Sequence, residues 1–155
     1  KKMLHVLAEF FDATLEAGVL YQRLLIVHVE SKLREAFPRV SVQRKGDDIF
    51  LSLNKDLTES AHAAYTRASA ASASLAKLSV SIATKTPVSV LLHWGFNIDA
   101  AGAPVKAVGF SELGWNGEEV LTFAKKLLTD YILETEEIRI AQCKVKPVGG
   151  LELDA

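Results

Sequence analysis

The chain has 155 residues, of which 49% are hydrophobic and 24% are charged, and its formal net charge is −1. These values are typical of one ordinary globular domain and are unlike the basic excess of dedicated nucleic-acid or membrane-surface proteins. A single cysteine excludes an intramolecular disulfide, and no signal-peptide pattern or long apolar run occurs. We therefore expect a single α+β domain over residues 1–155 that is cytoplasmic, does not enter a membrane and needs no cofactor.

Residues 1–37 are predicted to form an N-terminal helical arm. Gly18 is expected to weaken or break the first helix of this arm. The first helix is indicated by apolar residues at helical spacing, namely Leu4, Leu7, Phe11 and Leu15.

A second helix is predicted from about Val19 to Phe37. The apolar run 24–29 within it is also typical of a buried strand, and that alternative stays open. Helix is favoured because Glu30 and Arg34 lie one turn apart and form a favourable pair. Pro38 would end the helix.

Two hairpins are predicted in the middle of the chain. The first joins 40–43 to 49–53 through a turn at 45–48, and the second joins 88–98 to a strand at 105–113, preceded by another strand at 78–83. The second hairpin has the longest alternation of apolar residues and is the firmest of these predictions.

An Ala- and Ser-rich segment, 60–79, separates the two hairpins and is predicted to be a helix. Its small side chains would let it lie tightly across a sheet. A close contact with another helix, in the same or a second subunit, and a low-complexity linker are the alternatives.

The C-terminal part is predicted to contain a helix and a final strand. Asn116 and Glu119 resemble a capping box at the start of the helix. An acidic turn at 134–137 and a strand at 138–145 would follow. The inward face of the helix is expected to carry Val120, Phe123, Ala124, Leu127, Leu128 and Tyr131.

The predicted fold class is α+β, with a mainly antiparallel sheet built from hairpins and helices packed on one face, in the order α-α-β-β-α-β-β-β-α-β. This order resembles the roadblock family of small dimeric regulators. The stretch 96–133 is similar to the last hairpin and helix of type III secretion chaperones. Both resemblances are topological, cover no diagnostic motif and transfer no functional residue.

Several polar groupings are candidates for chemistry, and each also has a plainer interpretation. The set His5, Glu9, Asp12 and Glu16 would share one helical face and could bind a divalent metal, but the solvated face of a helix explains it as well. Asp47 and Asp48 could hold a cation, although a simple turn is favoured.

An enzyme would be built around His93 or Cys143. His93 lies among apolar neighbours, which makes it the best candidate for a perturbed imidazole. Cys143 lies in the predicted last strand without an assigned activating partner. A hydrogen-bonded sheet histidine and an inert thiol are the favoured interpretations.

A cluster of cations between residues 32 and 45 is the best indication of a nucleic-acid partner. Aromatic residues such as Trp94 and Phe96 could stack on bases, but they share a face with Val90 and Leu92, which indicates a core. The candidate nucleic-acid-binding residues are Lys32, Arg34, Arg39, Arg44 and Lys45.

Three functions follow as hypotheses. The leading one is a non-enzymatic, homo-oligomeric module that binds itself or another protein, because no catalytic motif is present and the long hairpin offers a strand edge. A nucleic-acid-binding protein that uses the basic stretch 32–45 is the second, and an enzyme with a site around His93 or Cys143 is the third. No metal site is predicted.

Overall fold

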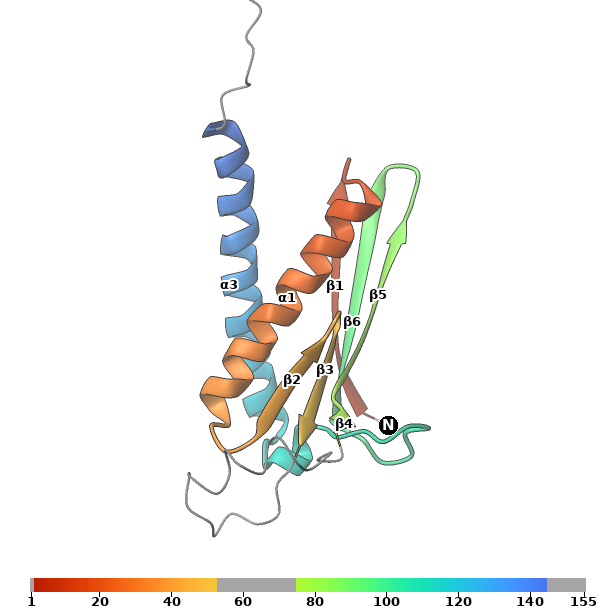
Figure 1. Ribbon diagram of the computed structural model, residues 1–155, viewed down its shortest axis with the longest axis vertical. Coiled ribbons are helices and arrows are strands. Elements are labelled where there is room, and N and C mark those ends of the chain that lie inside the picture. The colour runs from red at the N-terminus through yellow and green to blue at the C-terminus, as the bar shows by residue number, and fades with distance from the viewer. Residues whose placement is uncertain (1, 53–74, 145–155) are drawn as a thin grey trace, which may run out of the picture.

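The computed structural model describes residues 2–52 and 75–144 (Figure 1). This part of the chain is α+β with antiparallel sheets, which confirms the predicted fold class, although the order of the elements differs from the prediction. In chain order the elements are β1 (Lys2–Phe11), α1 (Leu15–Ala36), β2 (Ser41–Lys45), β3 (Asp48–Ser52), β4 (Ala76–Lys77), β5 (Ser79–Lys85), β6 (Ser89–Asp99), the 3₁₀ helix η1 (Ser111–Leu113) and α3 (Gly117–Lys144).

The strands form two three-stranded antiparallel sheets, in the orders β1-β6-β5 and β2-β3-β4. The chain passes from one sheet to the other at Leu78, which lies between β4 and β5. The Leu78 N–H donates to the carbonyl of Ile49 at 2.9 Å, and the Leu78 carbonyl accepts from the N–H of Asn97 at 2.9 Å. One buried residue therefore joins β3 of one sheet to β6 of the other.

The core lies between the sheets and the two long helices. On β6, Val90, Leu92, Trp94 and Phe96 are all buried, which confirms their interpretation as core. In Figure 1, α3 lies beside α1. Both helices contact the buried face of β6, because the Trp94 indole N–H donates to the Gln22 carbonyl and the Trp94 ring centroid lies 6.1 Å from that of Tyr131. The buried face of α1 consists of Gly18, Gln22, Leu25, Ile26, Val29 and Leu33.

The predicted helical arm is wrong at its start, because residues 2–11 form a strand. Its even-numbered side chains, including Val6, face the core, and β6 supplies a full-length partner from Ser89 to Asp99. The second half of the arm is confirmed as helix, including the run 24–29. Gly18 lies inside α1 without breaking it.

The predicted Glu30–Arg34 pair is also confirmed. The Arg34 guanidinium donates to Glu30 Oε1 at 2.8 Å. The helix ends at Ala36, two residues before Pro38, as expected. The first hairpin is confirmed too, with its turn at Gly46 and Asp47 between β2 and β3.

The segment 105–113 is not the predicted strand. It makes an isolated parallel bridge from Ala107 to Lys77 and then turns into η1. Gly109 packs so closely on β6 that a Cβ would lie 2.5 Å from the carbonyl oxygen of Ile98. Instead, β6 forms a hairpin with β5 across the predicted turn at 85–87, and its other edge pairs with the distant strand β1.

The end of the chain also differs from the prediction, because α3 continues to Lys144 through the expected turn at 134–137 and strand at 138–145. Its start is confirmed: the Asn116 N–H donates to Glu119 Oε2 at 2.8 Å, and Asn116 Oδ1 accepts from the N–H of Glu118 at 2.8 Å. The expected buried face is present, with Leu128 only partly buried.

The predicted helix at 60–79 lies mostly outside the described residues. Its last part is strand, since β4 covers Ala76–Lys77 and β5 begins at Ser79. No helix within residues 2–52 and 75–144 is long and apolar enough to cross a membrane.

Candidate interaction surface

The sheet β1-β6-β5 has one face against α1 and one face turned away from it. We call the second the outer face; it carries the odd-numbered side chains of β1 and β6 and the even-numbered side chains of β5. Leu7 is 75% exposed there, and Phe11 is 68% exposed. The other exposed apolar side chains of the outer face are Val80, Ile82 and Leu91.

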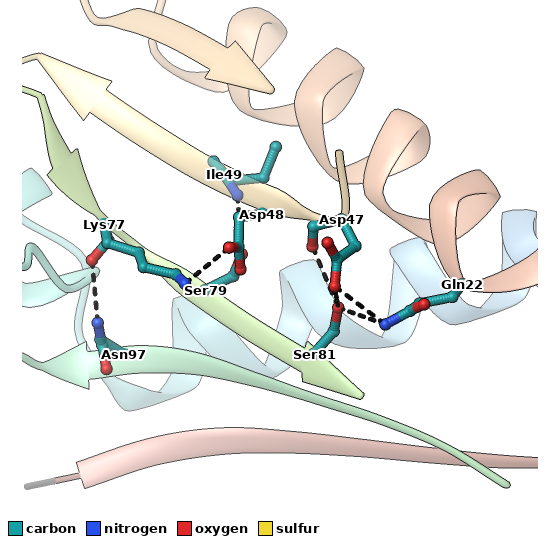
Figure 2. Close-up of polar contacts among 8 residues, drawn as sticks. All are labelled: Gln22, Asp47, Asp48, Ile49, Lys77, Ser79, Ser81 and Asn97. Atoms are coloured by element: carbon teal, nitrogen blue, oxygen red, sulfur yellow. Dashed lines mark hydrogen bonds and ion pairs between the residues drawn. The ribbon is translucent and has the colours of Figure 1, made fainter. Parts of the chain in front are cut away.

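Strand β5 shows why apolar residues are left on the outer face. The alternation of its residues was predicted correctly, but the serines face inward and Val80 and Ile82 face outward. The inward position is explained by hydrogen bonds. The hydroxyl of Ser79 accepts from the N–H of Ile49 at 2.9 Å, and Ser81 contacts Asp47 and Gln22 (Figure 2).

His5 and His93 lie together on the outer face. Nδ1 of His5 is 2.9 Å from Nε2 of His93, and the ring centroids are 5.1 Å apart. Sequence reasoning did not find this pair, because His5 was assigned to a helix. The alternation of Leu4, Val6 and Ala8 was the signal that could have placed His5 on a strand.

The remaining members of the predicted metal set are not brought together with His5 on one helical face. Glu9 accepts a hydrogen bond from the Ser89 hydroxyl at 2.7 Å, Asp12 lies in a turn with φ 57°, and Glu16 is in the first turn of α1. Within the described ranges, no group of three or more histidine, cysteine or acidic side chains is arranged to hold a metal ion.

The outer edge of β1 is a second feature of this surface, because β6 is the only strand that pairs with β1 among residues 2–52 and 75–144. The N–H of Asp12 donates to the carbonyl of Val88 at 3.0 Å, in register with the β1–β6 ladder. In an antiparallel pair the bonding residues alternate, so the even-numbered residues of β1 bond to β6. The N–H and C=O groups of Met3, His5, Leu7, Glu9 and Phe11 therefore point away from the sheet.

The outer strand of the other sheet is different. β2 is only 5 residues long and carries Gln43, Arg44 and Lys45. Short length and cations are features that discourage strand pairing at an edge. β1 has 10 residues, and its charged side chains are Lys2 and Glu9. β1 is thus the less protected edge.

The five predicted nucleic-acid-binding residues do not all project freely. Lys32 forms an ion pair with Asp130, while Arg34 and Arg44 both contact Glu30, the latter at 3.5 Å. The ammonium of Lys45 lies 5.1 Å from the ring centroid of Phe50, and Arg39 is exposed. Acidic side chains of the fold accompany three of these cations.

The other sequence-predicted candidates lie apart from one another. Asp47 and Asp48 lie at the predicted turn, and both side chains also make contacts with other elements. Asp48 forms an ion pair with Lys77 at 2.6 Å, and Asp47 is hydrogen-bonded to Ser81 and Gln22 (Figure 2). Cys143 is exposed near the end of α3, not in a strand. His93 and Cys143 thus lie on different elements.

A groove lies between α1 and α3. One part, of about 600 Å³, is lined by Trp115 and Phe123 with Glu118 and Lys126 at its rim. A second part, of about 320 Å³, lies farther along the helices and includes the Lys32–Asp130 pair. Ser31 and His28 both line this second part, but no hydrogen bond joins the two side chains among the described residues.

A family model described as "Domain of unknown function (DUF366)" matches residues 1–75 and residues 71–146. The chain belongs to this family. Its fold is similar to that of a solved structure described as "Protein of Unknown Function from Pyrococcus horikoshi", with a TM-score of 0.70 and 29% identity. The match covers 95% of this chain and 65% of the Pyrococcus chain, just under two thirds of its length. No curated protein matches. These comparisons indicate family and fold, and they name no activity.

Proposed function

We propose that this protein is a non-enzymatic protein–protein interaction module that forms homo-oligomers through the sheet β1-β6-β5. The observation that carries the proposal is the long edge of β1, which no strand of the described residues covers, with its five outward-pointing N–H and C=O pairs directly beside the exposed apolar outer face. Unpaired strand edges bind further strands through backbone hydrogen bonds.

The outer face supports the same proposal. Leu7, Ile82 and Leu91 come from three neighbouring strands and are all substantially exposed. Neighbouring exposed apolar side chains of this kind are typical of interaction sites on soluble proteins. Burial of apolar surface would favour association, while the strand edge would fix its direction.

Sedimentation velocity over a micromolar concentration series tests the proposal. We expect concentration-dependent association that Leu7→Lys weakens. Leu133→Lys is the matched control, because Leu133 on α3 is 58% exposed and Leu7 on β1 is 75% exposed. A strictly monomeric chain that also retains no protein in pull-down experiments would contradict the proposal, and so would equal effects of the two substitutions.

A further inference from the structure

We propose that the strand bound at the β1 edge is β1 of a second copy, antiparallel to the first, with Leu7 directly opposite Leu7 of the second copy. The inference rests on the proposed function, because it names the partner of the same surface. Three features of β1 support it: the direction of its backbone groups, the residues on its two faces, and the side chains along its free edge.

The backbone constraint selects which residues bond. The N–H and C=O groups of the odd-numbered residues of β1 point to the free edge, so these residues must form the hydrogen-bonded pairs of the new ladder. In a symmetric antiparallel pair that keeps the two faces aligned, one residue lies directly opposite its own copy, and the twofold axis passes between them. The register centred on Leu7 uses all five outward-pointing residues, from Met3 to Phe11.

The two faces restrict the register further. Side chains directly opposite each other point to the same face of a sheet, so a shift by one residue would place core-facing side chains on the outer face. Centring on Leu7 pairs Leu4 with Phe10 and Val6 with Ala8 on the inner side. All four are apolar, and Leu4, Ala8 and Phe10 are only partly buried in one copy.

The side chains along the free edge distinguish the Leu7 register from its neighbours. It places His5 opposite Glu9 of the second copy, twice by symmetry, and Met3 opposite Phe11. Centring on Val6 places Glu9 opposite Met3, and centring on His5 places the two imidazoles opposite each other. An imidazole N–H can donate to a carboxylate, so the Leu7 register is the one of these three that pairs a donor with an acceptor.

His5 and Glu9 each have one polar side-chain atom available for this contact. The contact of His5 with His93 uses Nδ1, and the bond of Glu9 with Ser89 uses Oε1. Among the described residues, none bonds to Nε2 of His5 or Oε2 of Glu9. The pair across the dimer therefore does not require the contacts within one copy to break.

Disulfide mapping tests the register, in a Cys143→Ser background that removes the exposed native thiol. Single cysteines are placed at His5, Leu7, Glu9 and Phe11 and oxidised at micromolar protein concentration. Hydrogen-bonded antiparallel pairs have Cα atoms about 5.5 Å apart, which suits a disulfide. We expect a covalent dimer for Leu7→Cys alone among the single variants, and for the double variant His5→Cys, Glu9→Cys.

The outcomes separate this inference from the proposed function. Dimers that cross-link best at His5→Cys, or equally at every position, overturn the Leu7 register. Oligomers in sedimentation that cross-link at none of the four positions overturn β1 pairing but leave the interaction module standing. A monomer that binds an extended strand of another protein at β1 would show that the partner is not a second copy. A monomer that binds no protein would overturn both proposals.

A charge substitution gives a second measurement. Glu9→Lys is expected to weaken the dimer about threefold to thirtyfold, because it removes the carboxylate acceptor opposite His5 at two symmetric positions. His5→Glu combined with Glu9→Lys restores most of the affinity. Glu137→Lys on α3 is the control with the same charge change at an exposed position. Equal weakening by Glu9→Lys and Glu137→Lys would overturn the pairing of His5 with Glu9.

Discussion

The Ser81 hydroxyl lies 2.7 Å from Asp47 Oδ2 and 2.7 Å from Gln22 Nε2, so a single strand residue joins the β2–β3 turn to α1 (Figure 2). Gln22 also donates to Asp47 Oδ2 at 3.1 Å, which closes a triangle of polar contacts. The triangle connects both sheets and a helix beside the apolar core. It explains why a serine, rather than Val80 or Ile82, faces inward on β5.

We expect Ser81→Ala to lower the free energy of unfolding by about 1–2 kcal/mol, because the substitution removes the shared hydroxyl and leaves partly buried partners less well bonded. Urea denaturation measures the change. Ser41→Ala is the matched control, since Ser41 is exposed on β2 and its loss should change stability by less than about 0.5 kcal/mol. Equal effects would show that the triangle contributes no net stability.

Gly18 marks the closest approach of α1 to β6. A Cβ at this position would lie 2.4 Å from Cγ1 of Val90, whose side chain is buried. Gly18→Ala should therefore destabilise the fold by about 1–3 kcal/mol, even though alanine is the better helix former. Gly117→Ala is the control, because nothing lies within 4 Å of its Cβ position in the first turn of α3. Thermal unfolding compares the two, and a Gly18→Ala variant as stable as Gly117→Ala would refute the close contact.

Several parts of the fold were predictable because local signals and tertiary packing agree. The capping box at Asn116, the turn at 45–48 and the apolar face of α1 are each specified by residues close in sequence. The core character of Trp94 and Phe96 followed from alternation on one strand. Fold class depends on these elements and was therefore correctly predicted.

The errors occur where long-range pairing decides between two local patterns. Residues 2–11 show both a helical stripe and strand alternation, and β6, almost 90 residues away in sequence, makes them a strand. Conversely, the predicted strand 138–145 alternates only in part, and its described residues 138–144 continue α3. The candidate surface could not be predicted for the same reason: the free β1 edge and the His5–His93 pair exist only once β1 lies beside β6.

Tyr131 connects the two long helices through its hydroxyl, which donates to the carbonyl of Tyr21 at 3.0 Å. Tyr131→Phe should lower the free energy of unfolding by about 1 kcal/mol at neutral pH. Tyr21→Phe is the control, since no hydrogen bond of the Tyr21 hydroxyl is found among the described residues. Urea denaturation of the three proteins measures the difference, and equal stabilities would exclude a contribution from the Tyr131 hydroxyl.

The same residue predicts an alkaline limit to stability. Burial raises the pKa of Tyr131 well above its ordinary value of 10.0, and Tyr21 raises it further. A raised pKa means that the stabilising contribution of the neutral phenol is complete below the unfolded pKa and is lost as the pH rises above about 10. We expect Tyr131→Phe to lose less stability than the wild type between about pH 9 and pH 11. Parallel pH profiles would contradict this expectation.

Asp130 predicts the behaviour at the acidic limit. The hydrogen bond from the Lys32 ammonium lowers the pKa of Asp130 below its ordinary value of 3.8, with smaller contributions from the charges of Lys32, Lys126 and His28. Because the folded pKa is lowered, the stability from this ion pair is fully present above the unfolded pKa and is lost as the pH falls through the folded pKa. Asp130→Asn should therefore be less stable than the wild type at pH 7, and the two should converge below about pH 3.

Chemical denaturation at a series of pH values measures this convergence for Asp130→Asn. The Asp130 side chain is 41% exposed, so added salt should reduce the difference at pH 7 through solvent screening. Glu137→Gln, an exposed change farther along α3, should show neither the difference at pH 7 nor the convergence. A stability gap for Asp130→Asn that stays constant from pH 7 to pH 2 would mean that the residue acts through packing and not through its charge.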